Sequence, residues 1–152
     1  YEVPATVIRN TNCYGPHDPH LSHIIPGTIM SVLKQHQPIV RGTGLTSKSY
    51  LYVDDVADAY LKIAQWSMEN QAGEAFNVSC PPITVLDLVR TILDVMLSDL
   101  QPEILEQQGD QSDEELDWSK AHRLTDWAPS KSLEEGIALT VAGFRQRMEV
   151  FA

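Results

Sequence analysis

The feature that most constrains the fold of this sequence is a strand-like run over residues 4–9 that ends in Asn10-Thr11-Asn12. A continuous apolar run, without alternation, is typical of a strand covered on both faces of a parallel sheet. Parallel α/β sheets bind ligands beyond the carboxyl ends of their strands. The polar residues after the run therefore predict ligand donors at the rim of a cleft, and a polar strand end that only caps the sheet fits the pattern equally well.

Helical and strand patterns alternate along the rest of the chain. A helix is predicted over residues 22–35, and strands are predicted over residues 49–53 and 75–79. This order predicts an α/β fold that begins on a strand. Three further helices are predicted. One begins at Asp54, and its inner face carries Val56, Ala59, Tyr60 and Ile63; the next opens on the capping pair Thr84 and Asp87. The last helix opens on the capping pair Ser132 and Glu135 and packs Ile137, Val141, Phe144 and Met148.

Composition excludes several classes of partner. The 152 residues suffice for one domain with a real core, and the formal net charge of -10 argues against nucleic acid. No apolar run approaches the ~20 residues that span a bilayer, so no membrane partner is expected. Cys13 and Cys80 lack a metal or redox spacing, which favours reduced thiols and a cytoplasmic location. The acidic run over residues 102–117 is predicted to be a solvated loop.

Two further segments have both a functional and a structural interpretation. Around Gly42-Thr43-Gly44, a glycine turn followed by the cation Lys48 could serve a diphosphate, although the pattern favours a hairpin with an exposed lysine. Three histidines and Asp18 fall within residues 17–23, and such side chains suit zinc. No fourth ligand is identifiable, so an exposed loop is favoured and no metal site is predicted.

The catalytic elements of a nicotinamide enzyme are not found in this sequence. No tyrosine has a lysine four residues later, and no glycine-rich motif lies between a strand and a helix. No serine or cysteine nucleophile pattern is present either. No catalytic residue is therefore assigned.

Several motifs resemble the NAD-dependent epimerase/dehydratase family, the extended short-chain dehydrogenases that act on nucleotide sugars. The first is Arg9-x-x-Asn12-x-Tyr14-Gly15-Pro16-x-Asp18. Segments 24–26, 42–55, 76–78 and 117–136 match later family motifs in the same order. Within the family, segments 38–41, 50–53 and 102–105 are most similar to the CDP-glucose 4,6-dehydratase branch.

The resemblance implies a fold and a role for the chain. The fold would combine strands of a partial Rossmann-type parallel sheet with the small substrate-binding domain of an extended short-chain dehydrogenase. Residues 1–152 would form one carboxyl-terminal substrate-binding portion, with the amino-terminal dinucleotide-binding portion absent. The parent enzyme would oxidise a sugar hydroxyl transiently with NAD, using a tyrosinate base. Asn10 and Thr11 would lie near the nicotinamide.

The chain itself would bind a nucleotide-diphosphate sugar and be inactive alone. The resemblance assigns Asn12 to the sugar or diphosphate, backbone groups of Ile39 and Val40 to the base, Lys48 to the diphosphate and Asn77 to a place beside it. The family usually has arginine where Lys48 stands. The alternative is a free-standing nucleotide-sugar-binding or assembly module without catalysis. Exposed strand edges predict a homo-oligomer or pairing with the missing half.

Overall fold

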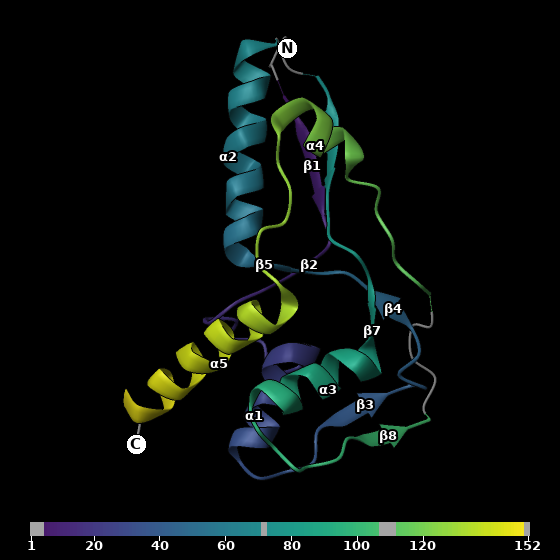
Figure 1. Ribbon diagram of the computed structural model, residues 1–152, viewed down its shortest axis with the longest axis vertical. Helices are drawn as coiled ribbons and strands as arrows, with labels where there is room; N and C mark the ends of the chain where they lie inside the picture. Colours follow the sequence, from purple (N-terminus) through teal and green to yellow (C-terminus); the bar gives the residue numbers. More distant parts are fainter. Residues whose placement is uncertain (1–4, 71–72, 107–111, 151–152) are drawn as a thin grey trace.

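The chain folds into two groups of elements stacked along its long axis (Figure 1). The computed structural model describes residues 5–70, 73–106 and 112–150, and only the backbone of residues 148–150, so Met148 lies outside the described side chains. Among the described residues, no helix is long and apolar enough to cross a membrane. The strands are β1 (Val7–Asn10), β2 (Asn12–Tyr14), β3 (Ile39–Arg41), β4 (Ser47–Lys48), β5 (Tyr50–Tyr52), β6 (Ala75–Val78), β7 (Ile83–Thr84) and β8 (Glu103–Leu105); the helices are α1 (Ile24–Leu33), α2 (Val53–Glu69), α3 (Val85–Val95), α4 (Ser119–Thr125) and α5 (Leu133–Val150).

The upper group is built on the parallel pair of β1 and β6, flanked by α2 and α4. Its core, called the smaller core here, includes Phe76 and Trp127, which are fully buried. Trp127 donates from its indole nitrogen to the carbonyl of Asp55, 3.0 Å away. The smaller core comprises Leu51, Ala59, Ile63, Phe76, Val78, Ala121 and Trp127.

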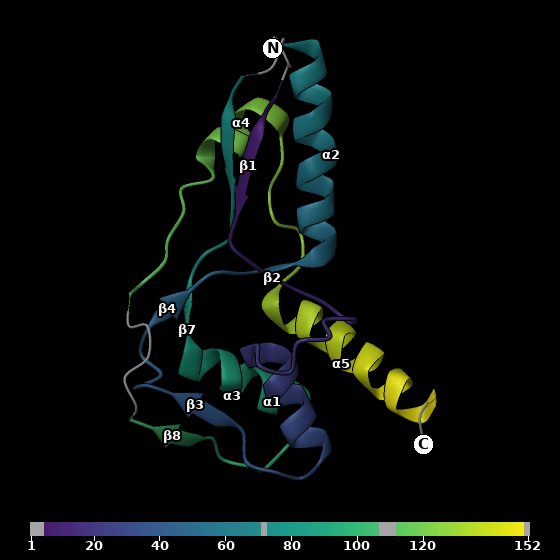
Figure 2. The ribbon, with the colours of Figure 1, turned by 180° about the vertical axis from the view of Figure 1, so that it is seen from behind.

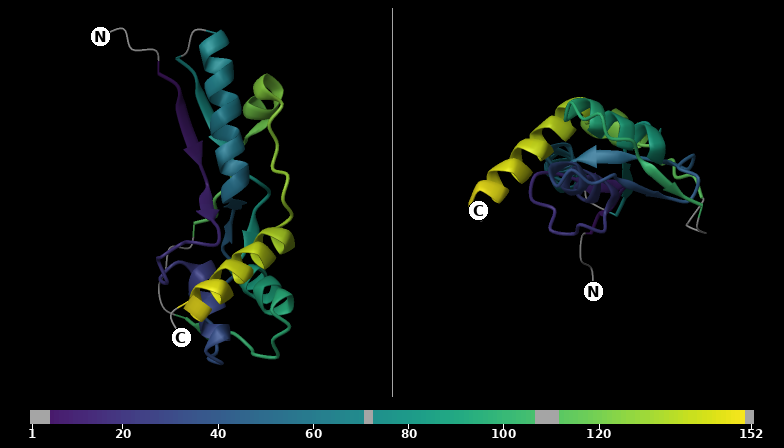
Figure 3. Two further views of the ribbon diagram at one scale, coloured as in Figure 1. Left: turned by 90° about the vertical axis from the view of Figure 1, so that its left-hand side faces the viewer. Right: turned by 90° about the horizontal axis from the view of Figure 1, so that it is seen from below.

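Two predictions for this group are wrong. The strand at residues 4–9 is not covered on both faces, because Val7 is 53% exposed and Arg9, on the same face of β1, is exposed too. β1 stands at the outer margin of the molecule (Figure 3, left). Tyr60 is not on the inner face of α2 either, since it is 46% exposed. It instead lies toward the end of β1, where its hydroxyl donates to Asn10 Oδ1 at 3.3 Å.

The lower group gathers α1, α3 and α5 around the larger core (Figure 2). The periodic apolar positions predicted for these helices are buried, for example Ile29, Ile92 and Ile137. The larger core comprises Tyr14, Ile25, Ile29, Val32, Val40, Tyr52, Leu88, Val89, Ile92, Leu93, Met96, Ile137, Val141 and Phe144.

The parallel pair of β2 and β5 joins the two groups. Because successive side chains of a strand point to opposite faces, Leu51 enters the smaller core while Tyr52 enters the larger one. Tyr14 packs edge-on against Tyr52, with ring centroids 5.7 Å apart. α5 approaches this pair closely at Gly136, where a Cβ atom would overlap the Tyr14 hydroxyl. The Tyr-Gly-Pro motif therefore holds α5 in place.

Two segments depart from their predicted form. The Gly42–Gly44 turn does not close a hairpin, because β3 pairs with β8 and β4 pairs with β7. The acidic run at residues 102–117 is not only a loop, because it supplies β8. β8 pairs in parallel with β3, and Glu103 N–H donates to the Pro38 carbonyl at 2.8 Å.

Both predicted capping pairs are confirmed. Thr84 Oγ1 accepts a hydrogen bond from Asp87 N–H at 3.1 Å at the start of α3. At the start of α5, Ser132 Oγ accepts from Glu135 N–H at 3.2 Å, and the Glu135 carboxylate accepts from Ser132 N–H at 3.0 Å. These reciprocal bonds satisfy backbone donors that a helix start leaves free.

Candidate ligand-binding site

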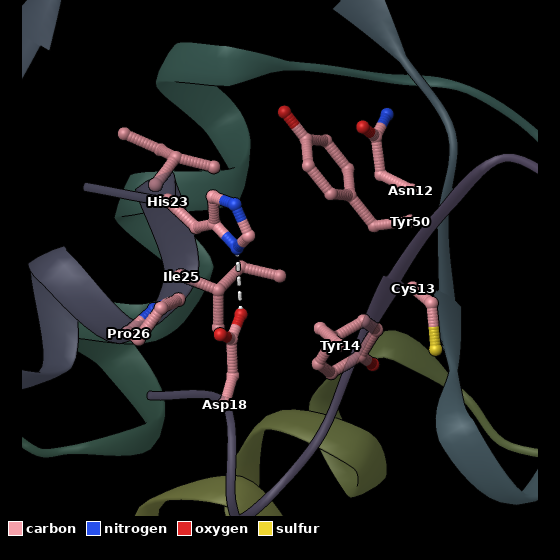
Figure 4. Close-up of a pocket in the computed structure, with 9 residues that line it drawn as sticks. Asn12, Cys13, Tyr14, Asp18, His23, Ile25, Pro26 and Tyr50 are labelled. Carbon is pink, nitrogen blue, oxygen red and sulfur yellow. Dashed lines mark hydrogen bonds and ion pairs between the residues drawn. The ribbon is translucent and has the colours of Figure 1, made fainter. Parts of the chain in front are cut away.

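A cavity of about 240 Å³ opens between β2, β5 and the start of α1 (Figure 4). It lies after the carboxyl end of β1, and Asn12 and Tyr50, the first residues of β2 and β5, line it. Asn12, predicted to contact a ligand, is part of its wall. The lining residues are Asn12, Cys13, Tyr14, Asp18, His23, Ile24, Ile25, Pro26 and Tyr50.

The Asn12 side chain is fixed by its own backbone surroundings. Its Nδ2 donates to the carbonyl of Ser49 at 3.1 Å. Ser49 is fully buried, and its hydroxyl donates in turn to the Cys80 carbonyl at 2.8 Å. Because this chain of bonds orients the amide, Asn12 Oδ1 is the atom left to accept a hydrogen bond from a ligand hydroxyl.

Tyr50 is the phenol that faces this cavity. Burial raises its pKa to about 12, and the nearby negative charge of Glu114 adds to the increase. Tyr50 therefore stays protonated at neutral pH and is suited to donate a hydrogen bond rather than to act as a tyrosinate base. Burial also raises the pKa of Tyr14, whose hydroxyl lies 3.5 Å from the Leu133 carbonyl. Tyr14 thus belongs to the packing under α5.

The histidine-rich loop places one hydrogen-bonded pair, His23 and Asp18, at the cavity. His23 Nδ1 lies 2.8 Å from Asp18 Oδ2, and the His20 N–H donates to Asp18 Oδ1 at 2.9 Å. Burial opposes ionisation of Asp18, but these hydrogen bonds outweigh it and lower the pKa of the carboxyl. Among the described residues, no group of three or more His, Cys, Asp or Glu side chains is placed to hold a metal ion. The pair instead orients the His23 ring between Asp18 and Tyr50 (Figure 4).

A second cavity, of about 350 Å³, adjoins the first on the other side of the α1 start. Both cavities include His23 and Ile24 in their walls. Ile39 lines the second cavity, as does Arg41 on the same face of β3, whereas the Val40 side chain is fully buried in the larger core. Its lining residues are Leu21, Ser22, His23, Ile24, Gly27, Thr28, Ser31, Ile39, Arg41 and Val85.

The remaining predicted site residues lie outside these two walls. Asn10 and Thr11 follow one another at the carboxyl end of β1, and Thr11 is 3% exposed. Asn77 is paired in register with Arg9, and its amide donates to the Asp117 carbonyl at 3.0 Å. Lys48 is half-buried in β4, opposite Ile83. The structure thus brings Asn12 and Ile39 to adjoining cavities, and the ligand role of every predicted site residue stays a prediction.

Sequence reasoning missed three residues that line the cavities. The sequence patterns connect His23 only with a metal, Arg41 only with a family segment, and Tyr50 only with a strand and a family segment. The signal for His23 was present, because it immediately precedes the Ile24-Ile25-Pro26 start of a helix, and free N–H groups at helix starts attract anionic ligands.

The fold is that of an α/β protein with parallel strand pairs, and two cavities adjoin beside the start of α1. The family model described as "NAD dependent epimerase/dehydratase family" matches residues 1–79. The chain belongs to the NAD-dependent epimerase/dehydratase family, so the family resemblance and the α/β class with Rossmann-type strands are confirmed.

Curated relatives carry related names. The chain is 26% identical to bovine dTDP-D-glucose 4,6-dehydratase, over 96% of this chain and 42% of the relative. It is 29% identical to the UDP-glucose 4-epimerase of Mycolicibacterium smegmatis, over 98% of this chain and 48% of the relative. The chain therefore spans less than half the length of these relatives.

Solved structures agree with this assignment. UDP-glucose 4-epimerase from Thermotoga maritima, solved with UDP-glucose, is 33% identical with a TM-score of 0.83, covering 94% of this chain and 46% of that one. dTDP-glucose 4,6-dehydratase from Bacillus anthracis, solved with NAD, has a TM-score of 0.84 at 24% identity, covering 98% of this chain and 47% of that one. The second likeness concerns the fold alone.

Proposed function

We propose that this chain is the nucleotide-sugar-binding portion of an NAD-dependent nucleotide-sugar epimerase or dehydratase, without catalytic activity by itself. The observation that carries the proposal is the pair of adjoining cavities that meet at His23 and Ile24. A sugar beside Asn12 and Tyr50 and a base beside Ile39 would be joined by a diphosphate across the start of α1. The T. maritima relative, solved with UDP-glucose, supports this class of ligand.

The start of α1 suits the diphosphate in this arrangement. No side chain caps the helix at His23, and its first turn contains no acidic residue. Backbone N–H groups and the positive end of the helix dipole therefore face the junction of the cavities. In a chain with a net charge of -10, such a local site is the means by which an anionic ligand can be held.

NAD fits this chain at one end only. Thr11 is nearly fully buried at the end of β1, and Thr11 Oγ1 has no hydrogen-bond partner in the part of the chain that the structure describes. With Asn10 beside it, this hydroxyl would hold the nicotinamide amide. When bound, NAD would accept a hydride from the sugar and return it. The sequence has neither a Tyr-x-x-x-Lys pair nor a dinucleotide-binding glycine motif, so the proton-transferring groups would come from a dinucleotide-binding portion.

The upper group offers a surface for that portion. β1 has an unpaired edge among the described strands, and a helix face with exposed apolar side chains lies beside it. A parallel strand supplied by the dinucleotide-binding portion would pair with the free edge of β1, and the helix after that strand would cover the apolar face of α2. In this arrangement residues 1–152 are the single substrate-binding portion that the sequence predicts. A second copy of the chain is the alternative occupant. The exposed face of α2 comprises Val53, Ala57, Tyr60, Leu61, Ala64 and Met68.

Calorimetric titration of the chain with UDP-glucose tests the proposed function. We expect binding that Asn12→Ala weakens by about tenfold, since the ligand loses a hydrogen-bond partner. Asn70→Ala is the matched control, because Asn70 lies at the far end of α2 and donates to the Trp66 carbonyl. An absence of heat for UDP-glucose, CDP-glucose and dTDP-glucose at millimolar concentration would contradict the proposal.

A further inference from the structure

The second cavity carries one charged side chain to which the proposed function gives no role, that of Arg41. Arg41 is exposed on β3 and lines the cavity together with Ile39. In the part of the chain that the structure describes, its guanidinium makes no ion pair and no hydrogen bond. Because no described carboxylate pairs with it, the guanidinium is available to a ligand group that carries hydrogen-bond acceptors.

The surroundings of Arg41 suit a flat, polar-edged ligand group. Apolar side chains of Leu21, Ile24, Ile39 and Val85 supply a surface on which a ring can lie. Hydroxyl groups at positions 22, 28 and 31 add hydrogen-bonding capacity, and no acidic side chain lines the cavity among the residues that the structure describes. The cavity is therefore better matched to a nucleobase than to a bare phosphate, which the start of α1 would hold next to it.

The chemistry of the guanidinium limits which base it can bind well. Arginine carries five N–H donors in a fixed planar fork and no acceptor. It pairs in bidentate fashion with two neighbouring acceptors, as with O6 and N7 of guanine. Cytosine also has two neighbouring acceptors, O2 and N3. Uracil and thymine have an N3–H donor between their carbonyl groups, so they offer the fork only one acceptor at a time.

We infer that Arg41 selects the nucleotide, favouring a base with two neighbouring acceptors, cytosine or guanine, over uracil and thymine. The inference rests on the proposed function, since it requires the base of the nucleotide sugar to lie in the second cavity. It makes Arg41 a specificity-determining residue of this site. It also separates this chain from the relatives whose names specify dTDP or UDP sugars.

Titration of the ¹⁵N-labelled chain with CDP, GDP, UDP and TDP, followed by amide chemical shifts, tests the inference. We expect CDP or GDP to bind about tenfold more tightly than UDP and TDP, the discrimination typical of one bidentate pair. Comparison of the CDP and GDP affinities shows which of the two bases Arg41 binds. Arg41→Lys keeps the charge but removes the fork, so it should abolish the preference and leave UDP affinity little changed. Arg90→Lys is the matched control, because Arg90 lies on α3 and pairs with Asp87.

Other outcomes would overturn the inference. Equal affinity for all four nucleotides would remove it and leave the proposed function in place. If Arg41→Lys weakens all four nucleotides and inorganic pyrophosphate to the same extent, Arg41 contacts the diphosphate and the inference is wrong. If none of the four nucleotides binds, the proposed function fails and the inference fails with it.

Discussion

The two hydrophobic cores of this chain differ in how completely they are enclosed. The larger core is surrounded by three helices and β3, and the exposed apolar residues around it, such as Leu45, Leu97 and Leu139, are scattered. Around the smaller core, Leu61 and Met68 are 72% and 87% exposed on one face of α2. β1 beside them has one edge that no described strand pairs with. Scattered apolar residues are normal on protein surfaces, whereas a continuous apolar face marks a contact surface.

This difference assigns separate tasks to the two regions. Both cavities are walled largely by α1, β3 and the residues that pack on the larger core. The residues predicted to face NAD, Asn10 and Thr11, lie instead at the end of β1 in the open region. Under the proposed function, the chain's own packing would support the nucleotide-sugar side of the site, and the cofactor side would depend on a contact made by the open region.

Removal of the largest side chain of the smaller core gives the largest expected effect. Trp127→Ala should cost about 3–5 kcal/mol of the free energy of unfolding, since Trp127 is fully buried. Hydrogen exchange should show lost protection in α2, β6 and α4 and retained protection in α1 and α3. Leu61→Ala, on the exposed face, is the control and should change stability little. Equal loss of protection in both regions would show that the cores are not separable.

The tie between the regions is the next target. Asp55 at the start of α2 is 4% exposed, and its carboxylate accepts from Ser130 N–H at 3.0 Å, from the Ser130 hydroxyl at 2.6 Å and from Lys131 N–H at 3.1 Å. Asp55→Asn should cost about 2 kcal/mol, because an amide cannot replace a charged acceptor of several bonds. Urea unfolding measures the loss. Asp54→Asn, at the exposed neighbouring position, is the control. If both variants lose the same free energy of unfolding, the hydrogen bonds of Asp55 do not tie the two regions together.

A smaller effect concerns pH and the larger core. Tyr14 and Tyr50 both have a pKa raised by burial, to about 12 for Tyr50. The folded state thus favours the protonated phenols, so their contribution to stability is complete below the ordinary tyrosine pKa near 10 and declines as the pH rises through the folded values. Urea unfolding at pH 8 and pH 11 should show a loss of about 1 kcal/mol that Tyr50→Phe reduces. If Tyr60→Phe, at an exposed tyrosine, reduces the loss of stability between pH 8 and pH 11 as much as Tyr50→Phe does, burial of the phenol is not the cause of that loss.

Sequence alone predicts the parts that depend on local patterns. The capping pairs, the strand at residues 75–79 and the position of Asn12 at a cavity all follow from residues near one another in the chain. The sequence does not place β8 at residues 103–105, because they form a strand only against β3, some sixty residues earlier. Tyr60 was misplaced because helical periodicity cannot show which face lacks a partner.

The second cavity was beyond sequence reasoning for a related reason. Its wall brings together His23, Arg41 and Val85, which no spacing rule connects. Family resemblance indicated Ile39 but gave no reason to select Arg41. Long-range packing of α1, β3 and α3 is the physical cause, and only the three-dimensional structure contains it.

Mapping of a bound nucleotide sugar onto the chain tests the central claim most directly. Amide chemical shifts of the ¹⁵N-labelled chain would be followed during titration with UDP-glucose or CDP-glucose, and separately with NAD. The account predicts shifts at Asn12, Ile24, Ile39 and Tyr50, around the larger core, and no saturable response to NAD. Sugar-nucleotide shifts confined to α2 and β1, or tight NAD binding by the chain alone, would contradict it.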